Sequence, residues 1–345
     1  MSEVSTAAPR RHLVTIKDVA ALAGVSWKTV TNVVHNRPNV RPDTRQRVLD
    51  AIQQLDYRPS AAGRHLRQGR TQTLTLVVPD IVNPYFAMLI EATFLAAESR
   101  GYTIFVEHAG TARAHERRAA SALLGFAFDG VIFHPTHATR EELTALAKHR
   151  PIVLVGENVR DTGLDRVSID NLRAAADVTR HLIDVGRRTI AFVGTRHGPV
   201  EPSHFRVEGY RTALREAGLP FREELLVPAQ DFTRLHGLNG AAALMESHPD
   251  VDGIVCVNDV LAVGVLRHLR LLGAQVPDDV AVTGWDNIPD SEYTAPPLTT
   301  IDAHVDNIAA HTVDLLIKRI EDPERPAEDV VLSHDLILRE SSTAG

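Results

Sequence analysis

The pattern of hydrophobic positions along the chain changes near residue 72. Before it, apolar residues recur every three or four positions over short segments, which is typical of small amphipathic helices. After it, short apolar runs alternate with helical patterns, and the runs read LTLVV, YTIFV, GVIFH, PIVLV, TIAFV, ELLVP, GIVCV and VAVTG. Strands that alternate with helices predict parallel, doubly wound sheets. Because the series resumes after about residue 170, we expect two α/β subdomains.

The first helical segment begins with a capping signal. Thr15 can accept hydrogen bonds from the free N–H groups of a helix that begins at Ile16, and Asp18 completes a capping-box arrangement. The apolar residues of this segment share one face: Ile16, Val19, Ala20 and Ala23. Gly24 is a typical residue for the end of a helix. The pattern predicts an amphipathic helix that ends at this glycine.

A second short helix follows after a tight turn, with Ser26 as its capping residue. Helical spacing buries Val30, Val33 and Val34 and turns Trp27, Lys28, Thr31 and Asn32 outward. A third helix begins near Pro42, and Tyr57 closes the small core. Two short helices joined in this way predict a helix-turn-helix, whose second helix enters the major groove of DNA.

Charge separates the same two regions. From Arg10 to Arg70 the chain has twelve Lys or Arg and four Asp or Glu, a net charge of +8. The other residues have 25 basic and 40 acidic side chains, a net charge of −15, so the overall value of −7 conceals a basic module joined to an acidic one. This asymmetry indicates a polyanionic partner for the first seventy residues alone.

Composition narrows the class of protein. The 345 residues are 44% hydrophobic and 23% charged, which are ordinary globular values. No apolar run approaches the roughly 18 residues that span a bilayer, and the first residues lack the apolar segment of a secretory signal. The single cysteine, Cys256, rules out an internal disulfide framework and lies in the apolar run GIVCV, where we expect a buried strand position. We expect a cytoplasmic protein with no membrane partner.

The sequence contains no motif typical of metal binding or enzyme catalysis. The seventeen histidines include no His-x-x-x-His helix with a third ligand. The sequence also has no G-x-G-x-x-G, no P-loop and no G-x-S-x-G. We therefore expect no metal site, no catalytic residues and no cofactor.

Four segments together identify a family. TIKDVAALAGVS, TVTNVVHN, TRQRVLDAIQQLDYRPSAAGRHL and DIVNPYFAMLIEA occur in this order. On these segments the chain resembles the lactose and galactose repressor (LacI/GalR) family of transcription regulators, and the resemblance continues to the last strand. It implies an N-terminal all-α helix-turn-helix headpiece with a hinge helix. An α/β core like the periplasmic binding proteins, with two doubly wound parallel-sheet subdomains, is expected to follow.

The resemblance also implies the domain limits. A disordered tail is expected over residues 1–14, the headpiece over 15–58, and the hinge helix with its linker over 59–71. The effector-binding and dimerisation domain is expected over 72–345. Its first subdomain should contain residues 72–169 and 302–326, and its second subdomain residues 170–301 and 327–345.

For DNA, the resemblance assigns base reading to Trp27, Lys28 and Asn32, with Thr29 and Thr31 near the backbone or base edges. The complete set of expected DNA contacts is Thr15, Ser26, Trp27, Lys28, Thr29, Thr31, Asn32, His35, Arg41, Tyr57 and Leu66. Lys28 can meet guanine acceptors, but as a point charge it discriminates less sharply than a bidentate arginine.

Within the implied hinge, Leu66 matches the leucine that the family's hinge helix inserts into the central minor-groove step of the operator. Two residues depart from the family's pattern nearby. Gly63 replaces the usual alanine, which costs a helix about 1 kcal/mol. Arg41 replaces the usual small capping residue before Pro42, which adds a phosphate contact or nothing.

The effector residues implied by the resemblance follow the predicted strands. Arg206, Asn258 and Asp286 are expected as polar contacts, and Tyr85 and Phe232 as aromatic walls; Phe86 follows the same strand as Tyr85 and is included. Aromatic faces pack against the C–H groups of sugars, while the polar groups bond hydroxyls, so this set suits a sugar or sugar derivative. By itself, Arg206 could equally be a surface helix charge.

Two neighbouring positions qualify this assignment. Asp259 is expected as a helix cap rather than a ligand contact. Gly156 stands where the family usually has an acidic residue, so a hydroxyl-binding carboxylate is missing and no specific sugar is carried over.

The sequence therefore predicts a homodimeric repressor of a sugar operon, associated with the nucleoid and released from a palindromic operator by its effector. The end LILRESSTAG has no leucine heptads, which favours a dimer over a tetramer. One alternative is a purine-type regulator, in which the ligand strengthens DNA binding. More remote alternatives are a sugar-binding transport protein and a sugar-processing hydrolase.

Overall fold

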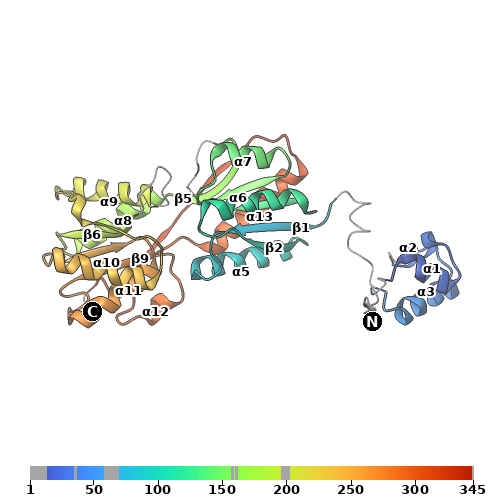
Figure 1. Cartoon of the computed structure of the whole chain (residues 1–345), viewed down its shortest axis with the longest axis horizontal. Coiled ribbons are helices and arrows are strands. Elements are labelled where there is room, and N and C mark those ends of the chain that lie inside the picture. The colour runs from blue at the N-terminus through green and yellow to red at the C-terminus, as the bar shows by residue number, and fades with distance from the viewer. Residues whose placement is uncertain are drawn as a thin grey trace, which may run out of the picture. The chain divides into compact units, whose positions relative to one another are not determined.

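The computed structural model describes residues 14–34, 37–57, 70–156, 159, 162–195 and 203–343. The chain forms two compact units, Met1–Thr71 and Gln72–Gly345 (Figure 1). Apart from Val14 and residues 70–71, the expected tail and hinge helix lie outside the described residues. No helix within the described ranges is both long enough and apolar enough to cross a membrane.

The described residues of the first unit form three helices, α1 (Ile16–Ala23), α2 (Trp27–Val34) and α3 (Pro42–Gln54). Helical spacing gives each helix one apolar face, and the three faces form a small core of Val19, Ala20, Ala23, Val30, Val33, Val48 and Ala51. Gly24 ends α1 with a φ of 63°, a left-handed conformation that glycine adopts without steric cost. The predicted helix-turn-helix is confirmed.

The second unit contains two six-stranded sheets. The first sheet has the order β11-β5-β4-β3-β1-β2, with every pair parallel. Its strands are β1 (Thr73–Val78), β2 (Thr103–His108), β3 (Gly130–Phe133), β4 (Ile152–Val155), β5 (Asp165–Ile169) and β11 (Asp329–Leu332). Its helices are α5 (Pro84–Glu98), α6 (Arg113–Ala122), α7 (Arg140–Ala147) and α13 (Val305–Glu321), with the 3-10 turn η1 (Leu123–Gly125). Separate apolar clusters fill its two faces, one beneath α5 and α13 and the other beneath α6 and α7.

The second sheet has the order β12-β10-β9-β8-β6-β7. Its strands are β6 (Ile190–Thr195), β7 (Leu226–Pro228), β8 (Gly253–Cys256), β9 (Ala281–Trp285), β10 (Thr299–Asp302) and β12 (Asp335–Ile337), of which β12 alone is antiparallel. Its helices are α8 (Asn171–Asp184), α9 (His204–Glu216), α10 (Arg234–Ser247), α11 (Asp259–Leu272) and α12 (Asp290–Tyr293), with the 3-10 turn η2 (Glu223–Leu225). Figure 1 shows the α8–α9 and α10–α11 pairs on opposite faces. The predicted fold class is confirmed, and Cys256 is buried in β8 as expected.

The chain passes between the two sheets three times, after β5, between β10 and α13, and between β11 and β12. Histidine–aspartate contacts join the crossing segments to their surroundings: His304 Nε2 lies 3.0 Å from Asp335 Oδ2, and His334 Nε2 lies 3.1 Å from Asp177 Oδ2. The last crossing differs from the sequence-based expectation. Residues 327–332 were placed in the second subdomain, but β11 pairs with β5 and belongs to the first sheet.

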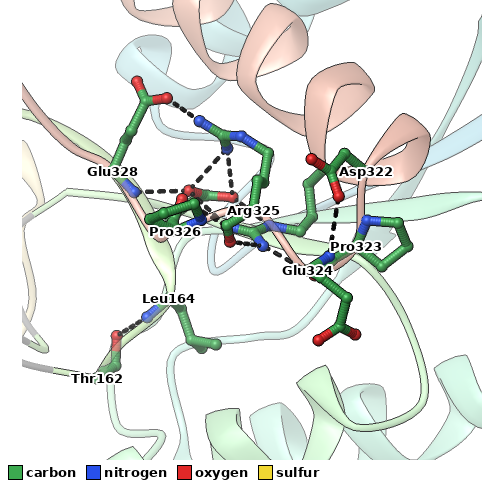
Figure 2. A network of polar contacts seen from close by, with 10 residues as sticks. Thr162, Leu164, Asp322, Pro323, Glu324, Arg325, Pro326 and Glu328 are labelled. Atoms are coloured by element: carbon green, nitrogen blue, oxygen red, sulfur yellow. Dashed lines mark hydrogen bonds and ion pairs between the residues drawn. The ribbon is translucent and has the colours of Figure 1, made fainter.

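A buried carboxylate explains the position of β11. The side chain of Asp165, at the start of β5, is fully buried, and Arg319 Nε donates to it over 2.8 Å. Arg325 Nη1 and the backbone N–H of Glu328 donate to the same carboxylate over 3.2 and 2.8 Å. Figure 2 shows the Arg325 guanidinium directed also at Glu328. The network fixes the end of α13 and the approach to β11 against β5, and local sequence patterns do not report such a long-range contact.

Asp165→Asn should lower the free energy of unfolding by about 3 to 5 kcal/mol, because it leaves two largely buried guanidinium groups without their carboxylate. The matched control is Asp314→Asn, which removes a more exposed pair with Arg100 and should cost less than about 1 kcal/mol. Urea titrations followed by circular dichroism measure both variants. Equal midpoints for the two would contradict a stabilising role for the Asp165 network.

Candidate functional site

Helix α2 presents exposed side chains at its N-terminal end. Ser26 Oγ accepts from the Thr29 backbone N–H over 3.2 Å and lies 3.0 Å from Thr29 Oγ1, so it caps the helix as expected. Trp27 is 52% exposed, and Lys28 is also exposed. Asn32 is half-buried on the next turn. A flat aromatic ring beside a cation on an exposed helix end is a suitable surface for the edges of bases.

Thr31 does not project outward, so that expectation was wrong. Its side chain is 9% exposed, and its hydroxyl donates to the Trp27 carbonyl over 2.9 Å. This bond to the preceding turn satisfies the hydroxyl and allows threonine to lie among apolar neighbours. Residue polarity alone placed Thr31 on the wrong face.

Other expected DNA contacts lie around the headpiece. Thr15 uses its backbone N–H and its hydroxyl to donate to Asp18 Oδ2, each over 2.7 Å, which forms the predicted capping arrangement at the start of α1. Arg41 is exposed immediately before α3. Tyr57 is half-buried against the headpiece core, and burial raises the pKa of its phenol. His35 and Leu66 lie outside the described residues.

The second unit contains a cavity of about 520 Å³ where the carboxyl ends of strands from both sheets meet. The loops after β1, β2, β3 and β4 line it from the first sheet, and α9 and the loops after β7, β8 and β9 line it from the second. The structure brings together all six residues expected from the sequence: Tyr85, Phe86, Arg206, Phe232, Asn258 and Asp286.

Arg206 extends from α9 into this cavity rather than into solvent. Its Nε donates to Asn171 Oδ1 over 3.0 Å, and its Nη1 donates to the Val257 carbonyl. Its guanidinium also lies 4.0 Å from the centre of the Trp285 ring, which stabilises a cation through the ring's π face. These contacts hold the arginine in one orientation along the cavity wall.

Asp286 brings a nearly buried carboxyl group to the same wall. Its side chain is 6% exposed, and its backbone has a φ of 104°, an uncommon conformation for a residue with a side chain. Burial raises the carboxyl pKa well above its ordinary value, Arg206 opposes the rise and Asp259 adds to it. Burial also raises the pKa of Tyr85, and the charge of Asp286 adds to that rise, which places the tyrosine near this carboxyl.

The helix cap at α11 differs from the expected one. Asn258 is the capping residue, since its Oδ1 accepts from the Leu261 N–H over 3.0 Å. The Asp259 carboxylate instead accepts from the Thr300 and Ser291 hydroxyls over 2.7 Å each and from the Ile288 N–H over 3.0 Å. Burial raises its pKa to about 6, against the lowering effect of these bonds. Asp259 therefore stabilises the segments behind the cavity wall and is not a lining residue of the cavity.

The sequence analysis missed several cavity residues, chiefly His134, Trp285 and Asn171. His134 follows β3 and Trp285 ends β9, so their positions at strand ends were a usable signal. Asn171 gave no such signal, because it opens helix α8. Among the described residues, no group of three or more His, Cys, Asp or Glu side chains is arranged to hold a metal ion.

A helix-turn-helix headpiece with an exposed basic and aromatic helix end, followed by a two-subdomain unit whose cavity is lined by polar and aromatic side chains, is typical of a DNA-binding regulator with a small-molecule site. Two family models match the chain: bacterial regulatory proteins of the lacI family over residues 15–60, and the periplasmic binding protein-like domain over residues 179–342. Both models agree with the architecture described above.

Similarity extends over almost the whole chain. Catabolite control protein A of Priestia megaterium is 34% identical over 95% of this chain and 99% of its own. The transcriptional repressor PurR of Actinobacillus pleuropneumoniae is 30% identical over 95% and 98%. The solved structure of a transcriptional regulator CelR–cellobiose complex is 30% identical, with a TM-score of 0.72 over 95% and 99%.

The chain belongs to the lacI family of bacterial regulatory proteins. It is a DNA-binding transcription regulator, as the sequence predicted, and its relatives are regulators rather than enzymes.

The raised pKa of Asp259 has a consequence for stability. The pKa of Asp259 in the folded protein, about 6, lies above the ordinary value of 3.8. The contribution of this group to the free energy of unfolding is therefore complete below about pH 4 and is lost as the pH rises through 6. Asp259→Asn should remove this dependence, so the stability difference between wild type and variant should change by about 3 kcal/mol between pH 4 and 7. Urea unfolding across this range measures it, and parallel stability curves for the two proteins would contradict the raised pKa.

Proposed function

We propose that this protein is a homodimeric repressor whose affinity for a palindromic operator is lowered when a sugar or sugar derivative occupies the cavity of its second unit. The observation that carries the proposal is the joint presence of a basic helix-turn-helix and a cavity lined by polar and aromatic side chains from two sheets. Apart from this effector, the proposed function requires no cofactor.

At the operator, Trp27, Lys28 and Asn32 are the base-reading side chains, because they lie on the exposed or half-exposed part of α2. Ser26 and Thr29 act mainly through the cap that orients this helix, and Arg41 lies where it can meet a phosphate. Thr15, Thr31, His35 and Tyr57 complete the proposed set of contacts and supporting residues. Leu66 is proposed as the minor-groove wedge.

In the cavity, Arg206, Asn258 and Asp286 are proposed to bond the oxygens of the effector. Tyr85, Phe86 and Phe232 supply aromatic surface for its C–H groups. This combination of directional polar groups with aromatic walls favours a polyhydroxylated ligand over an apolar one. The CelR structure, solved as a complex with cellobiose, supports the same class of ligand.

Ligand and DNA are coupled through the two subdomains. The cavity has one wall on each subdomain, and the subdomains are joined by three short crossings. An effector that contacts both walls favours one arrangement of the subdomains. If the effector changes the affinity for the operator by a certain factor, operator binding changes the affinity for the effector by the same factor. The proposed site of action is the cytoplasm, at the nucleoid.

The second candidate is a co-repressed regulator, in which the ligand strengthens operator binding. The direction in which the ligand changes operator affinity distinguishes the two functions. A thermal-shift panel of D-glucose, D-ribose, cellobiose and hypoxanthine tests the ligand class, and we expect a sugar to raise the midpoint.

Operator binding should weaken steeply with salt, because the basic first seventy residues displace counterions from several phosphates. Between about 50 and 200 mM salt, affinity should fall by about three orders of magnitude. The measurement is fluorescence anisotropy with a site selected from a random duplex library. The fragment 72–345 should lose this binding but retain the ligand response, and operator affinity retained by the fragment would contradict the proposal.

Arg206→Ala should lower affinity for the effector by about 10- to 150-fold, since it removes a charge-assisted bond worth about 1.5 to 3 kcal/mol. Operator affinity without effector should stay near wild type, because the arginine lies in the cavity wall of the second unit. Calorimetry with the sugar selected by the panel measures the change. Arg215→Ala, in the last turn of the same helix, is the matched control and should change neither affinity. Wild-type effector affinity in Arg206→Ala would contradict this role for the arginine.

A further inference from the structure

His134 is a cavity residue to which the proposed function gives no role. It follows β3 on the first sheet and lines the cavity with Tyr85 and Phe86. Its ring meets the Phe86 ring edge-on at 4.9 Å between centroids, which fixes the plane of the imidazole. Arg206 lies close enough to affect its titration, although it comes from the other subdomain.

The imidazole of His134 is neutral near pH 7. Burial lowers its pKa to about 4, a hydrogen bond with its own backbone opposes this fall, and the nearby Arg206 charge adds to it. A neutral imidazole has one N–H donor and one acceptor nitrogen. The ring therefore offers hydrogen-bonding groups to the cavity without adding a charge.

The two ring nitrogens differ in their surroundings. Nδ1 is buried and has no hydrogen-bond partner among the described residues. Nε2 lies on the side of the ring that faces Gly156. Nε2 is therefore the nitrogen that a ligand in the cavity can reach.

Gly156 provides the space for Nε2. This residue follows β4 with a φ of 92°, and a Cβ added there would lie 3.3 Å from Nε2 of His134. Both residues line the cavity. Any side chain at position 156 would crowd the ring nitrogen and strain the backbone, so glycine keeps the Nε2 side of the imidazole open.

We propose that His134 is the specificity-determining effector contact of the first subdomain, whose Nε2 forms a hydrogen bond with a hydroxyl of the ligand opposite Arg206. The ligand class is a hydroxylated compound that presents a hydroxyl group at this position, since a hydroxyl can both donate and accept. A cationic group is rejected there, because the charge of Arg206 is near. The inference rests on the proposed function in that this cavity is the effector site.

A purely structural role for His134 makes a different prediction. A histidine retained for stability uses its nitrogens in hydrogen bonds within the protein, but Nδ1 has none among the described residues. Contact with Phe86 needs only a side chain of similar size. Replacing His134 with an apolar residue should therefore leave the stability of the ligand-free protein unchanged or increased.

Three variants separate these roles in the full-length chain. His134→Gln keeps an N–H near the Nε2 position, His134→Asn places its amide near Nδ1, and His134→Met removes both groups. With the sugar that most raises the wild-type melting midpoint among D-glucose, D-ribose and cellobiose, Gln should bind within about threefold of wild type. Asn and Met should bind about 5- to 30-fold more weakly, which corresponds to the loss of one hydrogen bond.

Trp285 supplies the readout for these titrations, because its ring lines the cavity and the chain has one other tryptophan, Trp27. A Trp27→Phe background leaves Trp285 as the sole tryptophan, which is excited selectively over the tyrosines at the long-wavelength edge of its absorption. Equal affinities for the Gln, Asn and Met variants would overturn the proposal.

The ligand-free proteins provide a second test. His134→Met should melt at the wild-type midpoint or above it, whereas a drop of more than about 3 °C, the effect of losing about 1 kcal/mol, would show a structural histidine and overturn the proposal. A response to hypoxanthine alone would overturn the sugar class of the proposed function. The same three variants titrated with hypoxanthine would then decide whether Nε2 is a ligand contact.

Discussion

In both sheets of the second unit the central strands are parallel and direct their carboxyl ends toward one cavity. A parallel strand needs a helix to return the chain to the opposite edge, so the loops at the carboxyl edge are relieved of packing and can expose polar groups. Tyr85, Gly156, Asn258 and Asp286 all follow strands at this edge, although up to 201 positions separate them along the sequence. The site depends on this common strand direction more than on any single contact.

Placing polar groups in the cavity wall has an energetic cost. Asp259, buried behind the wall, is stabilised by hydrogen bonds from Thr300, Ser291 and Ile288. Asp286 is left with a strongly raised pKa even though Arg206 is near, and His134 has a buried nitrogen without a partner among the described residues. Locally unfavourable arrangements of this kind are typical of functional sites, where a complementary ligand can supply the missing interactions.

The second unit combines a sheet that is held by a buried charge network with crossing segments whose contacts can rearrange more easily. The buried Asp165 network holds α13 and β11 to the first sheet through two arginines. The crossings between the sheets, in contrast, are held by partly exposed histidine–aspartate pairs such as His304 with Asp335. Buried charge networks resist rearrangement more strongly than exposed pairs, so relative movement of the subdomains is easier at the crossings than within either sheet.

The sequence by itself determined the elements and their class, because helix periods, caps and apolar strand runs are local properties. Capping at Thr15 and Ser26 and both series of strands were accessible in this way, and the family resemblance, together with the positions of strand ends and a helix start, indicated the six cavity residues. The tertiary structure decided what depends on distant partners. Thr31 is buried because its hydroxyl finds a backbone carbonyl, and β11 joins the first sheet because Asp165 holds the chain that precedes it. His134 faces the cavity because Gly156 has no side chain, and these two residues meet only when neighbouring strands pair.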